Sequence, residues 1–561
     1  MPKLTPAQHA LQETRDVEAF FDAIEAANGD TTAVLDAVRH ESASSTKMKM
    51  PKRLDELLGR MQTKDEQRIF DAVSMGISEY KYLHGVAPTA DVIEAAIYQA
   101  GIAFRGVGMN GDILDNVSST ASSDFHAQGA LQPNRAVVAL MSAVAEAVPF
   151  AGLLPYDIGS NKAILAIVNN ESGSTFGDYV DGSIMDGVSS GDVFAMSSRF
   201  VKFDISGSAP FTAKFSDRNL TDANVGYCDP DATGVPVLRG RTVVYVNGRV
   251  AARDSFNGSG ATSPISGSVV VAGTTHTITG TVTVATGAVS LTSIAPALPA
   301  GTLVTSEGFI NYELAPGLIA NMVVRANTYD LYASPNRIRT RMGIDTQGQL
   351  RNELGLDGPS LSLMGARTQM ANERFYKALR KARDLGINNT VAYNFDHASQ
   401  KGEKNRPQIW QDFAPVLFNA SQKMVNDTMD HPITHMFVSA WVGGQMTGLG
   451  RDMFQPSGVT KRPGPYRLGR LFDEVEVYYS PKLIEQADNL SSSSIICVGR
   501  SSQPARCPII MGDAIPPTMM ELSMQSDLVQ QAAMYSRDFT EVNPHDPSAL
   551  GCARINITNL I

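Results

Sequence analysis

The chain has 561 residues, of which 43% are hydrophobic and 19% charged, and its formal net charge is -10. This length exceeds one ordinary core and predicts roughly two to four domains, while the acidic balance argues against a general nucleic-acid binder, which usually carries a basic excess. Four widely spaced cysteines without a CxxC pair and the lack of any long apolar run exclude a disulfide framework, a structural zinc site and a membrane span, and favour synthesis in a reducing cytoplasm.

Residues 1–132 are predicted to form a mainly helical N-terminal region. Apolar side chains recur there at helical spacing, for example at Ile69, Phe70, Val73 and Ile77. The polar stretch 41–53 is typical of a linker or a flexible arm. The segment 133–149 then predicts a helix that begins at one proline and ends at another.

From Lys162 the hydrophobic period changes to that of strands. The run "KAILAIV" predicts one continuous apolar strand, and "FVKFDISGSAPFTAKF" alternates in a way that predicts a long, exposed two-stranded excursion. Residues 227–308 are predicted to form a small all-β insert. It contains a strong hairpin turn at Asn247-Gly248 and another at Thr286-Gly287. The stretch "FINYEL" is predicted to form the strand that rejoins the parent domain.

The segment 346–389 predicts a long helix, clearest from Leu361 to Leu385 and ended by Gly386. Basic residues in its C-terminal part suit the helix dipole, with a role facing DNA as the alternative: Arg374, Lys377, Arg380, Lys381 and Arg383. Residues 390–530 mix strands and helices. The tail, 531–561, closes with an apolar strand from Ala553 to Ile557, which is expected to pair with an earlier sheet.

Three short matches to motifs of catalysis or binding lack the context that their chemistry needs. The GxGxxG match at 106–111 has no strand before it and no helix after it. The GxSxG match around Ser189 leads into an alternating strand, whereas a nucleophile elbow must open a helix. The calcium-loop match at 229–234 places Gly240 where a bidentate carboxylate is required.

His431 and His435 stand four residues apart, with Asp427 and Asp430 close by, which on a helix suits zinc. Pro432 lies between them and disfavours that helix, so two ordinary histidines are the preferred interpretation. The sequence therefore predicts no catalytic, cofactor-binding or metal-ligating residue and no cofactor. We expect a structural protein that is not an enzyme.

The order of these segments resembles the major capsid protein of tailed bacteriophages, which has the Hong Kong 97 type fold. Four stretches carry the resemblance: "AGLLPYDIGSNKAILAIVNN", "VTVATGAVSLTSIAPALPAGTLVTSEGFINYE", "GPYRLGRLFDEVEVYYSP" and "IICVGRSSQPARCPIIMGDAIPP". The resemblance covers residues from about 130 to 561. It lies in the order of the segments and in their general sequence character, without a diagnostic short motif. It implies an α+β fold with a peripheral (P) domain, an axial (A) domain, a long E-loop and an all-β insertion domain in the E-loop.

The resemblance also implies domain boundaries. They are a helical N-terminal region or arm at 1–132, the start of the P-domain and the ascending E-loop at 133–226, the β insertion at 227–308, the descending E-loop at 309–345, the P-domain spine helix at 346–389, the A-domain at 390–530 and a C-terminal P-domain strand at 531–561.

The function implied is repeated self-association into hexamers and pentamers of an icosahedral phage head around double-stranded DNA. Implied partners are the chain itself, scaffolding and portal proteins, a decoration protein, and DNA bound without sequence preference on the inner face; no membrane is involved. The chain would be assembled in the host cytoplasm and reside in the virion. Residues expected at contacts between subunits are Phe200, Lys202, Phe203, Phe211, Lys214, Arg374, Lys377 and Lys381. No partner asparagine or catalytic carboxylate is identified for a crosslink from an E-loop lysine.

The residues alone leave three alternative functions open. Another virion protein, such as a portal or tail-sheath subunit, is the nearest. A hydrolase with its site in 390–530 predicts loss of turnover on substitution of Ser189 or His431. A surface adhesin predicts a signal peptide and tandem β-domains, and the sequence has neither.

Overall fold

The computed structural model describes residue 54 and residues 63–105, 147–154, 162–220, 226–255, 260–353, 358–488, 491–522 and 529–560. The chain divides into two compact units. The first combines Met1–Ile167 with Thr328–Ile561, and the second is Val168–Asn327. The linker at 41–53, the GxGxxG match at 106–111 and most of the helix expected at 133–149 lie outside the described residues. No described helix combines the length and hydrophobicity needed to span a bilayer.

A seven-stranded mixed sheet, in the order β13-β21-β18-β14-β17-β16-β15, forms one half of the first unit. Its strands are β13 (Thr390–Asn394), β14 (His435–Val438), β15 (Phe454–Pro456), β16 (Tyr466–Leu471), β17 (Val475–Tyr479), β18 (Ser492–Val498) and β21 (Cys552–Thr558). The connecting helices are α9 (His397–Gln400), α10 (Arg406–Gln411), α11 (Ala414–Thr428), α12 (Ala440–Thr447) and α13 (Asp546–Ala549). Trp410, Phe413 and Met424 from these helices share a buried core with the inner faces of the strands.

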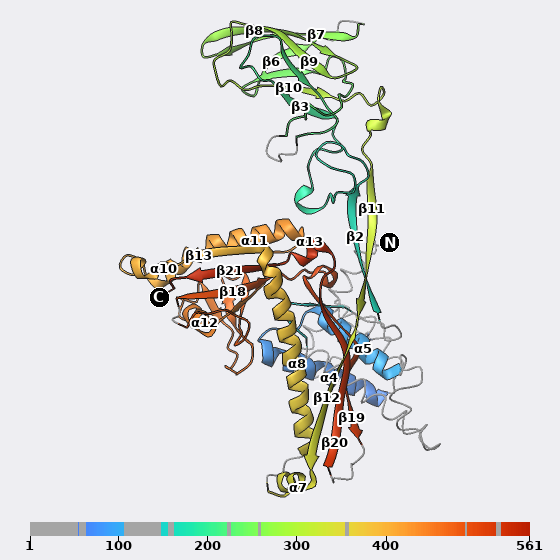
Figure 1. Cartoon of the computed structure of the whole chain (residues 1–561), viewed down its shortest axis with the longest axis vertical. Coiled ribbons are helices and arrows are strands. Elements are labelled where there is room, and N and C mark those ends of the chain that lie inside the picture. The colour runs from blue at the N-terminus through green and yellow to red at the C-terminus, as the bar shows by residue number, and fades with distance from the viewer. Residues whose placement is uncertain are drawn as a thin grey trace, which may run out of the picture. The chain divides into compact units, whose positions relative to one another are not determined.

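A four-stranded sheet in the order β1-β19-β20-β12 forms the other half. It consists of β1 (Gly152–Leu153), β12 (Ser334–Gly343), β19 (Ile509–Leu522) and β20 (Val529–Val542), with the short helix η4 (Pro504–Arg506) before β19. The long helix α8 (Gly358–Leu385) follows α7 (Ile344–Glu353), runs beside β12 and β20 in Figure 1, and continues into η3 (Gly386–Asn389). Phe375, Leu379 and Ala382 of α8 lie one turn apart on its buried face, which explains why this segment forms a helix against the sheet.

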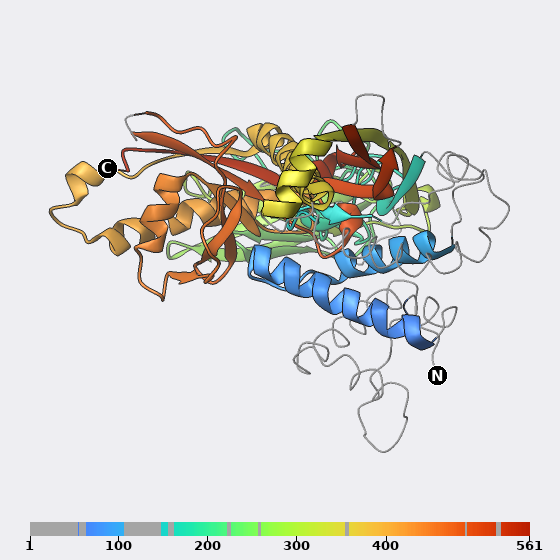
Figure 2. The same ribbon diagram turned by 90° about the horizontal axis from the view of Figure 1, so that it is seen from below.

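Two N-terminal helices, α4 (Thr63–His84) and α5 (Ala90–Arg105), belong to the same unit and are drawn in blue as neighbours in Figures 1 and 2. A two-stranded ribbon of β2 (Lys162–Ser172) and β11 (Met322–Tyr332) runs from the first unit into the second. Figure 1 shows its two strands side by side. The apolar run "KAILAIV" is therefore a strand, as predicted.

The second unit is built on an eight-stranded sheet in the order β3-β10-β5-β6-β7-β8-β9-β4. The strands are β3 (Ser198–Lys202), β4 (Phe211–Lys214), β5 (Val243–Val246), β6 (Arg249–Asp254), β7 (Thr262–Val271), β8 (Thr274–Thr283), β9 (Ala288–Ala295) and β10 (Val304–Phe309), with short helices η1 (Gly187–Ser189) and η2 (Pro316–Leu318). Both predicted hairpin turns are confirmed. Asn247 and Gly248 have positive φ, which suits the turn that the right-handed twist of two strands requires.

The structure corrects three strand predictions. The segment 200–215 is not a free two-stranded excursion, because β3 pairs with β10 and β4 pairs with β9 at the two ends of the eight-stranded sheet. The compact β unit is accordingly wider than 227–308. "FINYEL" does not rejoin the parent domain as a strand: β10 ends at Phe309, and β11 is the strand that returns.

The third correction concerns the C-terminal part. The terminal strand β21 does pair with earlier strands, but they are β18 and β13 of the seven-stranded sheet. The tail, expected to supply one strand over 531–561, therefore contains most of a second one, β20, which pairs with β19 and β12. Sequence alternation indicates that a segment is a strand but carries no information about which distant strand it joins.

Candidate subunit interface

The GxSxG match around Ser189 and the pair His431 and His435 lie in the described residues. Neither forms a reactive centre. Ser189 ends the short helix η1, and its carbonyl oxygen accepts a hydrogen bond from the Tyr179 hydroxyl. His435 starts β14 and His431 precedes it, so the helix that a zinc site would need is absent at this point. Across the described residues, no group of three or more His, Cys, Asp or Glu is arranged to hold a metal ion.

His435 is held in its neutral form. Burial, together with the positive charge of Arg500, lowers its pKa to about 3, and its Nδ1 lies 2.8 Å from the Thr434 hydroxyl. The Asp430 carboxylate contacts both His431 and Ser501, and these hydrogen bonds lower the pKa of Asp430. These groups are partnered within the subunit, which is the ordinary role that the sequence favoured for both histidines.

The five contact residues expected on the loop differ in exposure. Phe200 and Lys202 are exposed on the edge strand β3, whereas Phe203 is buried in the core of the second unit. Phe211 packs partly against the same core. Lys202 and Lys214 both line a surface hollow of about 880 Å³. Phe203 therefore cannot anchor the loop on a neighbour, because its ring already fills the subunit's own interior.

The three basic residues of α8 form ion pairs inside the first unit. Arg374 is buried, and its Nη2 lies 2.6 Å from Asp513 Oδ1 on β19. Gln99 Nε2 of α5 donates to the other carboxylate oxygen of Asp513 at 3.0 Å. Lys381 and Lys377 both reach Glu541 on β20. The prediction that Arg374 meets another subunit is wrong, since its side chain is only 8% exposed.

The N-terminal helices are attached to the rest of the first unit by a second buried ion pair. Arg500 Nη2 donates to both oxygens of Asp91 on α5 at 2.7 Å, and Arg500 Nη1 donates to the Pro149 carbonyl at 3.1 Å. On α4, Tyr80 and His84 are buried close to Tyr478 of β17. These contacts make α4 and α5 an integral layer of the unit, and both lie in the region that the sequence predicted to be mainly helical.

The ribbon of β2 and β11 presents one face whose apolar side chains are left uncovered. Odd-numbered residues of β2 pack into a core with Ile510 and Phe539. Every even-numbered residue from Lys162 to Val168 and from Met322 to Tyr332 is exposed. The Lys162–Asp330 ion pair at 3.2 Å confirms that the even-numbered positions share a face. We name this surface the ribbon face; its apolar members are Ile164, Val168, Met322, Val324 and Tyr332, each more than half exposed.

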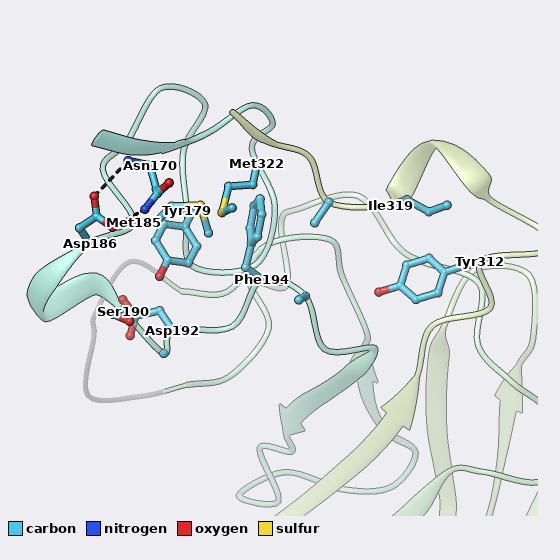
Figure 3. Close-up of a pocket in the computed structure, with 13 residues that line it drawn as sticks. Asn170, Tyr179, Met185, Asp186, Ser190, Asp192, Phe194, Tyr312, Ile319 and Met322 are labelled. Atoms are coloured by element: carbon cyan, nitrogen blue, oxygen red, sulfur yellow. Dashed lines mark hydrogen bonds between the residues drawn. The ribbon is translucent and has the colours of Figure 1, made fainter. Parts of the chain in front are cut away.

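A pocket of about 760 Å³ lies in the second unit near the start of β11. Tyr179, Phe194 and Met322 line it together in Figure 3, with Tyr312 and Ile319 on its other side. We name it the aromatic pocket. Its described lining contains two carboxylates, Asp186 and Asp192, and no Lys, Arg or His. Asp186 accepts hydrogen bonds from Asn170 at 2.8 and 3.0 Å, while burial and the nearby Asp178 raise the pKa of Asp192.

Sequence reasoning overlooked both surfaces. A signal for the ribbon face was present, because "AILAIV" is apolar at even as well as odd positions. Such a strand is typically covered on both faces, and among the described residues only its odd-numbered face is covered. No comparable signal existed for the aromatic pocket, whose lining comes from loops more than a hundred residues apart.

No protein-family model matches the chain, and no curated protein matches it. Among solved structures, the chain is similar to the capsid of jumbo bacteriophage PhiKZ, with a TM-score of 0.35 and 9% identity over 73% of this chain and 91% of that one. It is also similar to the capsid of Myoviridae phage XM1, with a TM-score of 0.28 and 12% identity over 43% of this chain and 78% of that one. An encapsulin complex from Synechococcus elongatus gives 0.26 and 10%, over 42% and 79%.

The first two of these structures are phage capsids and the third is an encapsulin. TM-scores this low do not assign a function, so the function has to follow from the geometry of the chain itself. That geometry has the α+β architecture expected: a long helix on long strands, a separate sheet with its own helices, and an extended ribbon that carries an all-β unit.

Proposed function

We propose that this chain is a shell-forming capsid subunit of the Hong Kong 97 type, which associates with copies of itself into hexamers and pentamers of an icosahedral phage head. On this proposal the chain resides in the virion, acts without catalysing a reaction, and surrounds packaged double-stranded DNA. Scaffolding and portal proteins, and a decoration protein on the β unit, are the further partners to be sought.

The observation that carries the proposal is the ribbon face. An isolated two-stranded hairpin is marginally stable in water, and here one of its faces exposes side chains such as Ile164, Val324 and Tyr332 at 61–63%. Burying a side chain of this size stabilises by about 1.5–3 kcal/mol. A ribbon of this composition is favourable when a neighbouring copy covers it, and unfavourable when the subunit stays alone.

The edges of the sheets support the same proposal. Strands β3 and β4 end the eight-stranded sheet, and β12 ends the four-stranded sheet. Edge strands offer unpaired backbone groups to another chain. Contacts between unlike patches of identical subunits close into rings when the rotation between copies permits it, and rings are the units from which a shell is built.

The test is electron microscopy of the purified full-length chain at high concentration, with three proteins compared. The native chain should form closed shells, either alone or together with tubes and capsomer rings. The double variant Ile164→Lys, Val324→Lys places two charges on the ribbon face and should remain a small particle. The control, Val270→Lys, changes a half-exposed valine of β7 outside the ribbon and should assemble as the native chain does.

A native chain that stays a clean monomer at high concentration would contradict the proposal. Rings of a single fixed size without shells, or helical tubes alone, would instead favour the portal or sheath alternative. Assembly of the ribbon variant at the native level would show that the exposed ribbon face is not the surface that neighbouring copies cover.

A further inference from the structure

We propose that the aromatic pocket of one copy receives arginine side chains from strand β12 of a second copy, which makes the pocket and this strand the two halves of one contact between subunits. This inference rests on the proposed function, because it needs two copies of the chain to meet.

The pocket has the chemistry of a site for a cation with an apolar stem. Its described lining offers the rings of Tyr179, Phe194 and Tyr312 and the carboxylate of Asp192, and it supplies no positive charge of its own. No ion pair joins Asp192 to a described residue. Aromatic faces attract a guanidinium placed over them, and a carboxylate in a partly apolar pocket adds a charge-assisted partner.

The rim of the pocket has side chains that a monomer leaves uncovered. Ile319 and Met322 are 62% and 57% exposed, and both line the pocket from the segment that leads into β11. The volume, about 760 Å³, exceeds what one side chain fills, so the occupant is expected to be a segment of chain that brings both apolar and charged groups.

Strand β12 carries the complementary charge. Arg337, Arg339 and Arg341 occupy alternate positions on one face and are all exposed. Their partners across the ladder on β20 are Tyr535, Ala533 and Gln531, none of which is acidic. Arg337 lies over the Tyr535 ring at 5.6 Å, while Arg339 and Arg341 pair with no carboxylate among the described residues.

The position of β12 makes these arginines available to another subunit. It is the last strand of its sheet, so one of its edges has no described partner strand. Side chains at alternate positions of a strand are roughly 6.6–6.8 Å apart, so this face of β12 can deliver two guanidinium groups into a single pocket. A basic strand without acidic partners and an acidic pocket without basic partners are complementary, and complementary charges fix the register of an interface.

A charge exchange tests the contact. Asp192→Lys should lower the extent of assembly, measured by light scattering and electron microscopy at one protein concentration, by at least about tenfold, and Arg339→Glu, Arg341→Glu should do the same. The triple variant that combines all three changes restores opposite charges across the contact. It should recover most of the native assembly.

Two controls each reverse a single charge elsewhere. Asp181→Lys alters an exposed aspartate outside the pocket, and Arg451→Glu alters an exposed arginine away from β12; both should assemble as the native chain does. In urea, tryptophan fluorescence should give the native unfolding midpoint for the variants of β12 and Arg451, which lie in the first unit with both tryptophans. Circular dichroism in urea should do the same for Asp192→Lys and Asp181→Lys, which lie in the second unit. These measurements separate a lost contact from a lost fold.

The outcomes separate this inference from the proposed function. If the native chain assembles and either charge variant does too, or if the triple variant recovers nothing, the pocket and β12 do not meet, although the shell proposal stands. The same holds if the Arg339→Glu, Arg341→Glu shells form normally but lose bound DNA, since the arginines would then serve phosphate groups. If the native chain never assembles, the proposed function itself fails.

Discussion

At the scale of single residues, the buried pair of Arg374 and Asp513 should dominate the stability of the first unit. Both side chains are less than a tenth exposed and lie 2.6 Å apart, with Gln99 as a further donor. Removing one partner of a buried pair leaves an uncompensated charge and typically costs about 3–5 kcal/mol. We therefore expect Arg374→Leu to lower the free energy of unfolding by roughly this amount, measured by urea denaturation with tryptophan fluorescence.

The matched control for this prediction is Lys377→Leu, one turn further along α8. Lys377 is 44% exposed and its Nζ lies 4.0 Å from Glu541, and an exposed pair of this kind contributes at most about 1 kcal/mol. Equal losses for the two variants would show that the burial of Arg374 carries no special weight.

Residues of one type thus differ in role for a reason that the sequence does not reveal. Arg374, Lys377 and Lys381 follow one another at helical spacing and all reach acidic partners on the sheet, yet Arg374 alone of the three is less than a tenth exposed. Alternation places Phe200 and Phe203 on opposite faces of a strand but does not say which is buried; the structure exposes the first and buries the second. Periodicity predicts which side chains share a face; the packing partner decides which face is buried.

At the scale of elements, the attachment of α4 should depend on pH through two buried histidines. His84 on α4 and His435 on β14 both lie close to the Tyr478 ring, with ring centroids 6.3 and 5.9 Å from it. Burial lowers the pKa of each to about 3, with further lowering by Arg462 for His84 and by Arg500 for His435. Both therefore stay neutral in the folded chain.

The sign of the pH effect follows from proton uptake. Between pH 3 and 6.5 the unfolded chain binds protons at these positions and the folded chain does not, so the free energy of unfolding falls as the pH is lowered through this window. The slope is at most about 1.4 kcal/mol per pH unit for each histidine. His84→Phe should reduce the slope measured by urea denaturation between pH 7.5 and 4.5, and His397→Gln, outside this cluster, should not.

Elements were predicted best where the signal is local. The turns at Asn247-Gly248 and Thr286-Gly287, the strand "KAILAIV" and the helix that ends at Leu385 follow from residues adjacent in sequence. The placement of β3, β4, β20 and β21 depends on strands far away in the chain. The aromatic pocket depends on such placement too, so it could not be predicted.

At the scale of the whole molecule, each of the two units contains a hydrophobic core of its own. The ends of the β unit meet on the ribbon, where the Gly173 amide donates to the Asn321 carbonyl at 2.7 Å. Replacing residues 174–320 by an Asn-Gly turn should therefore close the ribbon as an ordinary hairpin. A domain with its own core is expected to fold without its neighbour.

Because both tryptophans of the chain, Trp410 and Trp441, lie in the first unit, their fluorescence in urea reports that unit alone. The free energy of unfolding of the shortened chain should equal the native value to within about 0.5 kcal/mol, as sites without shared contacts do. It should also fail to assemble, since it lacks the aromatic pocket. A free energy of unfolding lower by several kcal/mol would mean that the first unit draws its stability from the β unit, whereas native-like shells from the shortened chain would remove the pocket from the assembly contacts.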